Sequence, residues 1–199
     1  MSEDENRRKY LRIDDRISLY VKPLTETEAE EAILHFEIRR MDFSLMSHLV
    51  YGREQHMPQM RVIEKRHPEV AGYLKFLEKQ IETLSSRIID QDHRLNPEKT
   101  CKVNISAEGL RFDTDRPYPP DAMFEIALML FPSRTSMLAF GKVVRSEKET
   151  EDAVARWKTA IQFTHLHEED REIMIKHIHQ KQITQIRQRD ESPVVEKTE

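Results

Sequence analysis

Two short segments of this sequence carry side chains suited to binding a charged ligand. The first is a cationic run that includes Arg7, Arg8 and Arg12, directly before a stretch with strand character. A guanidinium group binds phosphate, or the O6/N7 edge of guanine, through paired hydrogen bonds. The run therefore predicts a site for a phosphate ligand that carries guanine. The alternative interpretation is a solvated basic arm that balances the acidic residues 3–5.

The second segment is a polar turn between two strand-like stretches. Asn104 and Ser106 offer hydrogen-bonding side chains, and Gly109 closes the turn. A glycine at this position either lets a ligand approach the backbone or adopts a backbone angle closed to bulkier residues. The alternative is an ordinary hairpin turn, because Asn, Ser and Gly are the usual turn residues. The two segments form one ligand site only if the fold brings them to the same face.

Together the segments resemble the PilZ family, whose pattern is RxxxR followed by [D/N]xSxxG. The matching residues, with one preceding arginine, are Arg7, Arg8, Arg12, Asn104, Ser106 and Gly109. The resemblance covers about residues 1–23 and 100–180. It implies a small β-barrel that binds bis-(3′,5′)-cyclic dimeric GMP (cyclic di-GMP), a bacterial second messenger. The long segment between the motifs resembles an atypical branch of the family with added heptad helices, some members of which self-associate and do not bind the dinucleotide.

The composition is lean for a globular protein, with 38% hydrophobic and 34% charged residues in a chain of 199. It fits a modest barrel core with solvated helices. A net charge of −4 argues against a DNA- or RNA-binding protein. The single cysteine, Cys101, excludes an intrachain disulfide, and the acidic start of the chain is not a secretory signal. No apolar run reaches the ~20 residues of a membrane helix, so we expect a cytoplasmic protein without membrane insertion.

Alternating apolar and polar residues predict six strands. They are expected at residues 16–21, 102–105, 110–113, 123–130, 137–145 and 156–163, followed by a helix over 168–188. The fold class is therefore α+β, a PilZ-like six-stranded antiparallel β-barrel interrupted by a two-helix coiled-coil insertion, plus a C-terminal helix. The expected divisions are 1–23 with 100–188 for the barrel and terminal helix, 24–99 for an inserted helical oligomerisation segment, and 189–199 for a disordered tail.

The inserted segment is predicted to contain two helices. The first begins at a capping sequence on Thr25 and ends near Gly52, and the Pro58-containing residues 53–67 are expected to be a connector. The second begins at Pro68, a residue suited to the first helical position. Its apolar residues at heptad spacing are Leu74, Leu77, Ile81, Leu84, Ile88 and Leu95. This seam predicts a homodimer or homotetramer, and the alternative is an intrachain hairpin that covers it.

Nothing in the sequence predicts catalysis or a metal site. No nucleophile–base arrangement or phosphate-binding glycine loop is present. The pair His177 and His179 lies two residues apart in a predicted helix, where side chains do not share a face. We therefore expect no enzyme activity, metal or cofactor. The predicted function is a cyclic-di-GMP receptor that self-associates and acts on a further protein partner. The alternative is an oligomeric scaffold or interaction module of the same fold that does not bind cyclic di-GMP.

Overall fold

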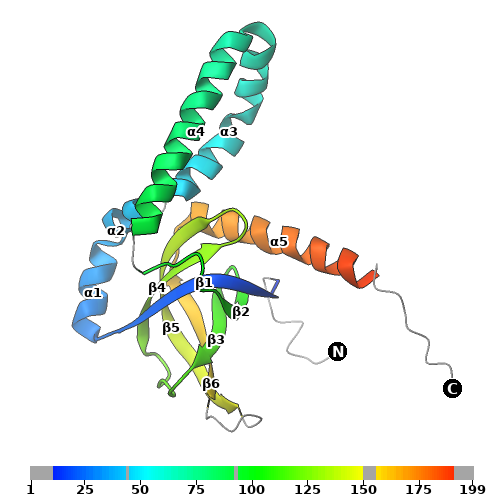
Figure 1. Cartoon of the computed structure of the whole chain (residues 1–199). Helices are drawn as coiled ribbons and strands as arrows, with labels where there is room; N and C mark the ends of the chain where they lie inside the picture. Colours follow the sequence, from blue (N-terminus) through cyan, green and yellow to red (C-terminus); the bar gives the residue numbers. More distant parts are fainter. Residues whose placement is uncertain (1–10, 44, 92–93, 150–155, 191–199) are drawn as a thin grey trace, which may run out of the picture.

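The centre of the molecule is a closed β-barrel, from one end of which a pair of helices projects (Figure 1). The computed structural model describes residues 11–190, except 44, 92–93 and 150–155. The strands are β1 (Ile13–Leu24), β2 (Cys101–Ser106), β3 (Gly109–Thr114), β4 (Met123–Leu130), β5 (Thr135–Glu149) and β6 (Arg156–His165). They are antiparallel and follow one another around the barrel in the order β1-β2-β3-β6-β5-β4. The predicted six-stranded antiparallel barrel is confirmed.

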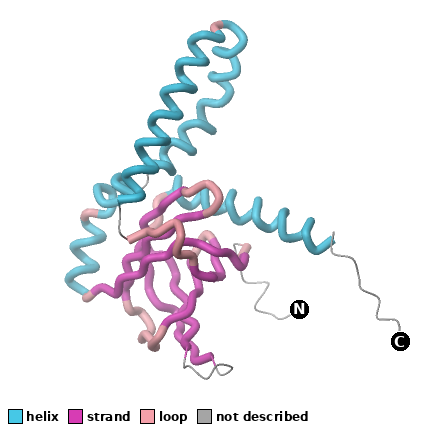
Figure 2. The backbone as a smooth tube through the Cα atoms, in the orientation of Figure 1, coloured by secondary structure: helices cyan, strands magenta, loops and turns pink. Residues whose placement is uncertain are grey.

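Within the described residues, five helices accompany the barrel, and they lie outside its strands (Figure 2). They are α1 (Glu26–Leu34), α2 (Phe36–Phe43), α3 (Leu45–Arg66), α4 (Pro68–Gln91) and α5 (Glu168–Asp190). The first four lie between β1 and β2 in the chain. Of these, α3 and α4 form the projecting pair, whereas α1 and α2 pack on β4 and β5. The predicted C-terminal helix, α5, contacts β1 and β2. The predicted tail lies outside the described residues from residue 191 onward.

The interior of the barrel is filled by every second side chain of its strands. In β1, Ile13 and Ile17 are buried, whereas the intervening Asp14 and Arg16 are exposed. This alternation follows from the pleat, which turns successive side chains to opposite faces. Several outward positions of β1, β2 and β3, such as Arg16, Lys102 and Asp113, are consequently polar and exposed.

Strand β4 departs from this alternation because both of its faces are buried. Ile126 and Leu128 belong to the barrel interior, while Ala127 and Met129 pack in a second cluster on the outside. Helices α1 and α2 supply partners for that outer cluster, among them Phe36, whose ring lies edge-on to that of Phe140 on β5. The burial of both faces explains the nearly continuous apolar sequence of β4.

The start of α1 is a capping box, as the sequence predicts. Thr25 is the N-cap residue, and its backbone N–H donates to the carboxylate of Glu28 at 2.9 Å. That hydrogen bond, with further contacts from Lys22 and the Thr25 hydroxyl, lowers the pKa of Glu28 to about 2. The helical segment therefore begins at a residue fixed by local sequence.

The boundaries inside the helical segment differ from expectation. Gly52 does not end a helix, and residues 53–66 are not a connector but the continuation of α3, with Pro58 inside it. The helix expected from Thr25 is instead divided into α1, α2 and the first part of α3. Local sequence underestimates α3 because packing against α4 stabilises it, and tertiary contacts commonly override propensity. Pro68 does begin α4, as predicted.

Leu95 does not belong to the helical seam. Helix α4 ends at Gln91, and Leu95 lies beyond it with only 3% of its surface exposed. Its side chain packs in the outer cluster with Ala127 and Met129 of β4. The heptad position was fortuitous, and we correct the assignment: Leu95 attaches the end of the insertion to the barrel.

Candidate ligand-binding site

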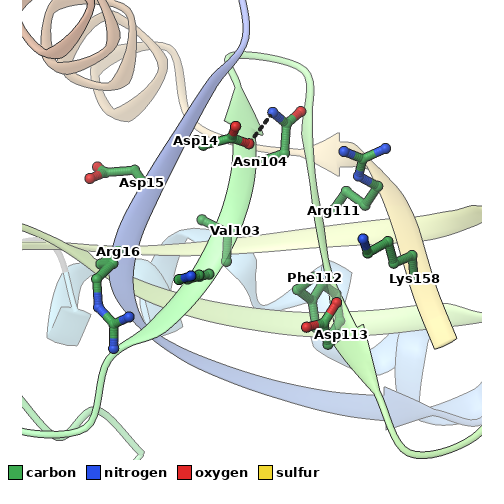
Figure 3. A pocket seen from close by; sticks show the side chains of 10 residues that line it. Asp14, Asp15, Arg16, Val103, Asn104, Arg111, Phe112, Asp113 and Lys158 are labelled. Carbon is green, nitrogen blue, oxygen red and sulfur yellow. Dashed lines mark hydrogen bonds between the residues drawn. The ribbon is translucent and has the colours of Figure 1, made fainter. Parts of the chain in front are cut away.

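A polar groove of about 480 Å³ lies on the outward face of β1, β2, β3 and β6 (Figure 3). Its lining residues are Asp14, Asp15, Arg16, Lys102, Val103, Asn104, Arg111, Phe112, Asp113 and Lys158. Strand register places them, since Asn104 pairs with Asp14 on one side and with Arg111 on the other. Arg16 pairs with Lys102 one step further along β1 and β2. The groove is therefore built by four strands, and the predicted residue Asn104 lies in it.

Asn104 is held in the groove by Asp14. The Asn104 Nδ2 donates a hydrogen bond to the Asp14 Oδ1 at 2.7 Å. Because a carboxylate only accepts hydrogen bonds, the amide nitrogen must face it. Asp14 was not among the residues predicted for the site. The sequence pattern predicts that this strand begins at Arg16, whereas β1 begins at Ile13 and carries Asp14 opposite Asn104.

Ser106 and Gly109 shape the turn and do not line the groove. Ser106 is 2% exposed, and its hydroxyl donates to the Gly109 carbonyl at 3.2 Å. Gly109 has no positive φ angle. A Cβ atom on it would lie 2.1 Å from the backbone oxygen of Ile161 on β6. The close approach of β6 thus requires a glycine here, and the unusual backbone angle expected as one reason for it is absent.

The cations of the groove differ in how they are paired. Arg16 donates to the side chain and the carbonyl of Thr100, both at 3.3 Å, and Lys158 forms an ion pair with Glu149. This hydrogen-bonded pair raises the pKa of Lys158. The guanidinium group of Arg111 makes no hydrogen bond or ion pair with any residue that the structure describes, although its backbone pairs within the sheet. Arg111, at the register position beside Asn104, therefore presents a guanidinium group to an anion.

The arginine run enters the barrel next to this groove. Arg7 and Arg8 lie outside the described residues. Arg12 is exposed and stands directly before β1, two residues ahead of Asp14. The chain therefore brings the end of the run to the strand that lines the groove with Asn104.

Helix α5 is attached to β1, which follows the arginine run, and to the turn of the second motif. Beside Asp14, the carboxylate of Asp15 points to the opposite side of β1 and binds His177 at 2.7 Å and Lys181 at 2.9 Å. Burial raises the pKa of Asp15, but the hydrogen bonds from His177 and Lys181 outweigh it and the net pKa is lowered. Arg171 donates to the carbonyl of Ala107 in the β2–β3 turn at 2.7 Å. A displacement of β1 or of the β2–β3 turn would therefore change the contacts of α5 directly.

A second exposed surface lies on α4, along a row of residues that we name the α4 stripe: Val70, Tyr73, Leu77, Ile81 and Leu84. Their spacings of three and four residues place them on one helix face, and each is between 37% and 62% exposed. The face turned to α3 is a different one, with Ala71 and Ser85 buried. The hairpin expected as an alternative does form, yet three residues of the predicted seam remain on the exposed stripe.

The remaining two seam residues are placed as follows. Leu74 is half-buried beside the α3 face. The side chain of Ile88 is outside the part that the structure describes. Salt bridges accompany the α3–α4 packing, with Arg53 reaching Glu78 at 3.6 Å and Lys75 pairing with Glu64. Helix α4 is therefore packed against α3 on one face, while the adjacent face that carries the α4 stripe is exposed.

The groove has the character of a binding site rather than a reactive one. Apart from Val103 and Phe112, its lining residues carry hydrogen-bond donors, acceptors or charges, without a nucleophile–base pair among them. Within the described ranges, no group of three His, Cys, Asp or Glu side chains is arranged to hold a metal ion. None of the helices described is long and apolar enough to cross a membrane.

The described residues form a closed six-stranded barrel with a groove on its outer face and helices built between its first two strands. Residues 83–180 match the model of the PilZ domain family, and the barrel is a PilZ domain. PilZ is a family that binds cyclic di-GMP, and its domain is a receptor without enzymatic activity. The resemblance found in the two sequence motifs is confirmed.

Solved structures that are similar to this chain include two bacterial proteins. One is a pathogenic protein from Xanthomonas campestris, a tetrameric PilZ domain self-assembled via a helical bundle. It matches with a TM-score of 0.54 and 15% identity over 89% of each chain, which shows a shared fold. The other is the Bacillus subtilis inhibitor of motility MotI/DgrA, with a TM-score of 0.45 and 10% identity over 89% of this chain and 52% of that one. No curated protein sequence matches the chain.

Proposed function

We propose that this protein is a non-catalytic receptor for cyclic di-GMP that self-associates through its inserted helices. The observation that carries the proposal is the groove, where Asn104 and the unpaired Arg111 stand beside the strand that continues from the arginine run. Arginine forks suit both parts of this ligand, its phosphates and the O6/N7 edge of its guanines. Because a second messenger acts inside the cell, this function implies a cytoplasmic protein.

In this proposal the ligand lies between the arginine run and the groove. Arg7, Arg8 and Arg12 bind its phosphates and guanines, while Asn104 and Arg111 bind it from the barrel surface. Contacts between a phosphate ligand and a chain segment are a common way to switch a surface. The contacts of α5 with Asp15 and with the β2–β3 turn offer a route from the groove to a surface that a downstream protein reads.

Self-association rests on the α4 stripe. Exposure of apolar surface to water costs about 25 cal/mol of free energy per Å². Contiguous apolar patches therefore commonly mark protein interfaces. The stripe continues along one face for more than three turns, from Val70 to Leu84. The tetrameric Xanthomonas campestris protein, assembled via a helical bundle, has the same fold. We infer that this chain forms a homodimer or homotetramer in which α4 helices pack on one another.

The stripe also supports the second candidate function, an oligomeric scaffold that does not bind the dinucleotide. The test that separates the two is isothermal titration of the full-length protein with cyclic di-GMP, with cyclic di-AMP as the control ligand. The receptor proposal predicts saturable binding of cyclic di-GMP and much weaker binding of cyclic di-AMP. No heat of binding with cyclic di-GMP at high micromolar concentration would refute the receptor and leave the scaffold.

A further inference from the structure

The groove contains an acceptor pair that the proposed function does not use. Asp14 is exposed at the edge of the groove, and only one of its oxygens is engaged, by Asn104 at 2.7 Å. Each carboxylate oxygen accepts two hydrogen bonds, so both oxygens keep vacant lone pairs. The Asn104 Nδ2 likewise has a second hydrogen that this bond does not use.

Together, the two side chains present three adjacent hydrogen-bonding positions. Passing from Asn104 to Asp14, these are a donor, the Asn104 Nδ2–H, and two acceptors, the Asp14 oxygens (Figure 3). The Watson–Crick edge of guanine has the complementary order, with O6 as acceptor and N1–H and N2–H as donors. The adenine edge reverses the first two roles, so that donor would face donor and acceptor would face acceptor.

We propose that Asp14 determines the base specificity of the groove by accepting N1–H and N2–H of a guanine, with the Asn104 amide donating to O6. This inference rests on the proposed function, since it assigns a reader for the guanine of that ligand. The arginines then act on the phosphates and on the O6/N7 edge, while Asp14 excludes adenine. A carboxylate near a phosphate ligand weakens binding by charge repulsion. Recognition of the base by Asp14 explains why a carboxylate is nevertheless present in the groove.

The simpler account is that Asp14 and Asn104 are a cross-strand pair that stabilises β1 against β2. A structural pair affects the binding of all ligands alike, whereas a base reader affects the ratio between ligands. The discriminating ligand is cyclic di-IMP, because hypoxanthine differs from guanine only by lacking the 2-amino group.

The experiment measures the dissociation constants of cyclic di-GMP and cyclic di-IMP for the full chain and for Asp14→Ala. A hydrogen bond to a charged group predicts that the unmodified protein prefers cyclic di-GMP by about 10- to 150-fold. In Asp14→Ala the ratio should fall to about one. The matched control is Asp113→Ala, which removes another exposed carboxylate of the same groove and should leave the ratio unchanged. Asp14→Asn, of nearly the same shape, serves if the alanine variant does not fold.

The outcomes separate this inference from the function on which it rests. If cyclic di-GMP binds but the unmodified protein shows no preference over cyclic di-IMP, Asp14 is not a base reader and the receptor remains. The same holds if Asp14→Ala or Asp14→Asn keeps the full preference. If the unmodified protein binds neither ligand, the receptor proposal itself is refuted, and the base-reading role with it.

Discussion

The groove and the α4 stripe are both exposed, but their side chains are satisfied in different ways. In the groove, Asn104 bonds Asp14 and Arg16 bonds Thr100, and water solvates the remaining polar atoms. On the stripe, the side chains are apolar or, as in Tyr73, largely apolar, and their contact with water is unfavourable. A polar groove is stable with or without a ligand, whereas an apolar stripe is stabilised only by a partner. Under the proposed function, the groove can therefore be empty or occupied, whereas the stripe is covered within the assembly.

The largest expected effect is on assembly. Replacing Leu77 and Leu84 together by glutamate places unpaired charges in the apolar stripe, which is strongly disfavoured in an interface. We expect the protein to sediment as a monomer, with its affinity for cyclic di-GMP within about twofold of the original. The control is Lys79→Glu with Thr83→Glu, on an exposed face of α4 away from the stripe, which adds at least as much negative charge. A monomeric unmodified protein at tens of micromolar would contradict the assembly proposal.

The next effect concerns the attachment of α5 to the barrel. Asp15→Asn leaves His177 and Lys181 without their carboxylate, and loss of one member of a buried ionic group costs about 3 kcal/mol of unfolding free energy. The measurement is urea unfolding at neutral pH, with cyclic di-GMP absent. A change below 0.5 kcal/mol, on the order of a surface substitution, would show that this contact does not hold the helix.

The same contact predicts a pH dependence of known sign. The pKa of Asp15 is lowered from its ordinary value of 3.8 by the folded state. Its contribution to stability is therefore present above 3.8 and is lost as the pH falls through the lower value of the folded protein. The stability difference between the unmodified protein and Asp15→Asn should shrink across that acid range. A difference that grows on acidification would have the wrong sign.

A comparable effect is expected on ligand affinity when an arginine is removed. Arg8→Ala or Arg12→Ala removes a paired contact worth about 1–3 kcal/mol, which is roughly 5- to 150-fold in the dissociation constant. Titration calorimetry measures this loss, and sedimentation should show the assembly unchanged. Arg134→Ala, an arginine in the β4–β5 turn, is the control for nonspecific loss of charge. Equal weakening by all three variants would indicate general electrostatics rather than a site.

The smallest effects compare a glycine of the barrel with one of the helical pair. Gly109→Ala forces a Cβ to within 2.1 Å of the Ile161 carbonyl unless β6 moves, and overpacking of this kind costs about 1–3 kcal/mol. Gly72→Ala, on α4 with no atom within 4 Å of its Cβ, should instead stabilise by about 0.5–1 kcal/mol. Thermal unfolding of both variants checks the signs. A neutral Gly109→Ala would show that β3 and β6 adjust freely at this point.

The sequence was most informative where local pattern and tertiary structure agree. Strands such as β4 and β6 were predicted within two residues, since alternation and apolar runs reflect burial directly. Asp14 was missed because Asp15, a carboxylate at an inward position, hides the alternation of β1. The carboxylate of Asp15 can be buried because His177, 162 residues further along the chain, supplies a hydrogen-bond partner. Long-range pairing of this kind leaves no local signal.

The helical segment shows the same limit. The proline and the charges of residues 53–67 predict a break, but α4 supplies a packing surface and ionic partners for the helix that actually forms there. Leu95 satisfies the heptad spacing yet lies after the end of α4. Periodicity identifies the residues that are apolar together, and it does not identify which surface covers them.

The double burial of β4 has a consequence for any attempt to separate the barrel from its insertion. Ala127, Met129 and Leu138 on the outside of the sheet are fully covered, and α1, α2 and the segment at Leu95 supply the cover. Excision of residues 25–99 would expose this surface and leave a barrel prone to aggregation. A shortened protein should retain α1, α2 and Leu95 and join the chain across the tip of the α3–α4 pair. The part of the insertion nearest the strands thus belongs to the folded core of the barrel domain. Only the distal half of the insertion can be removed without exposing that core.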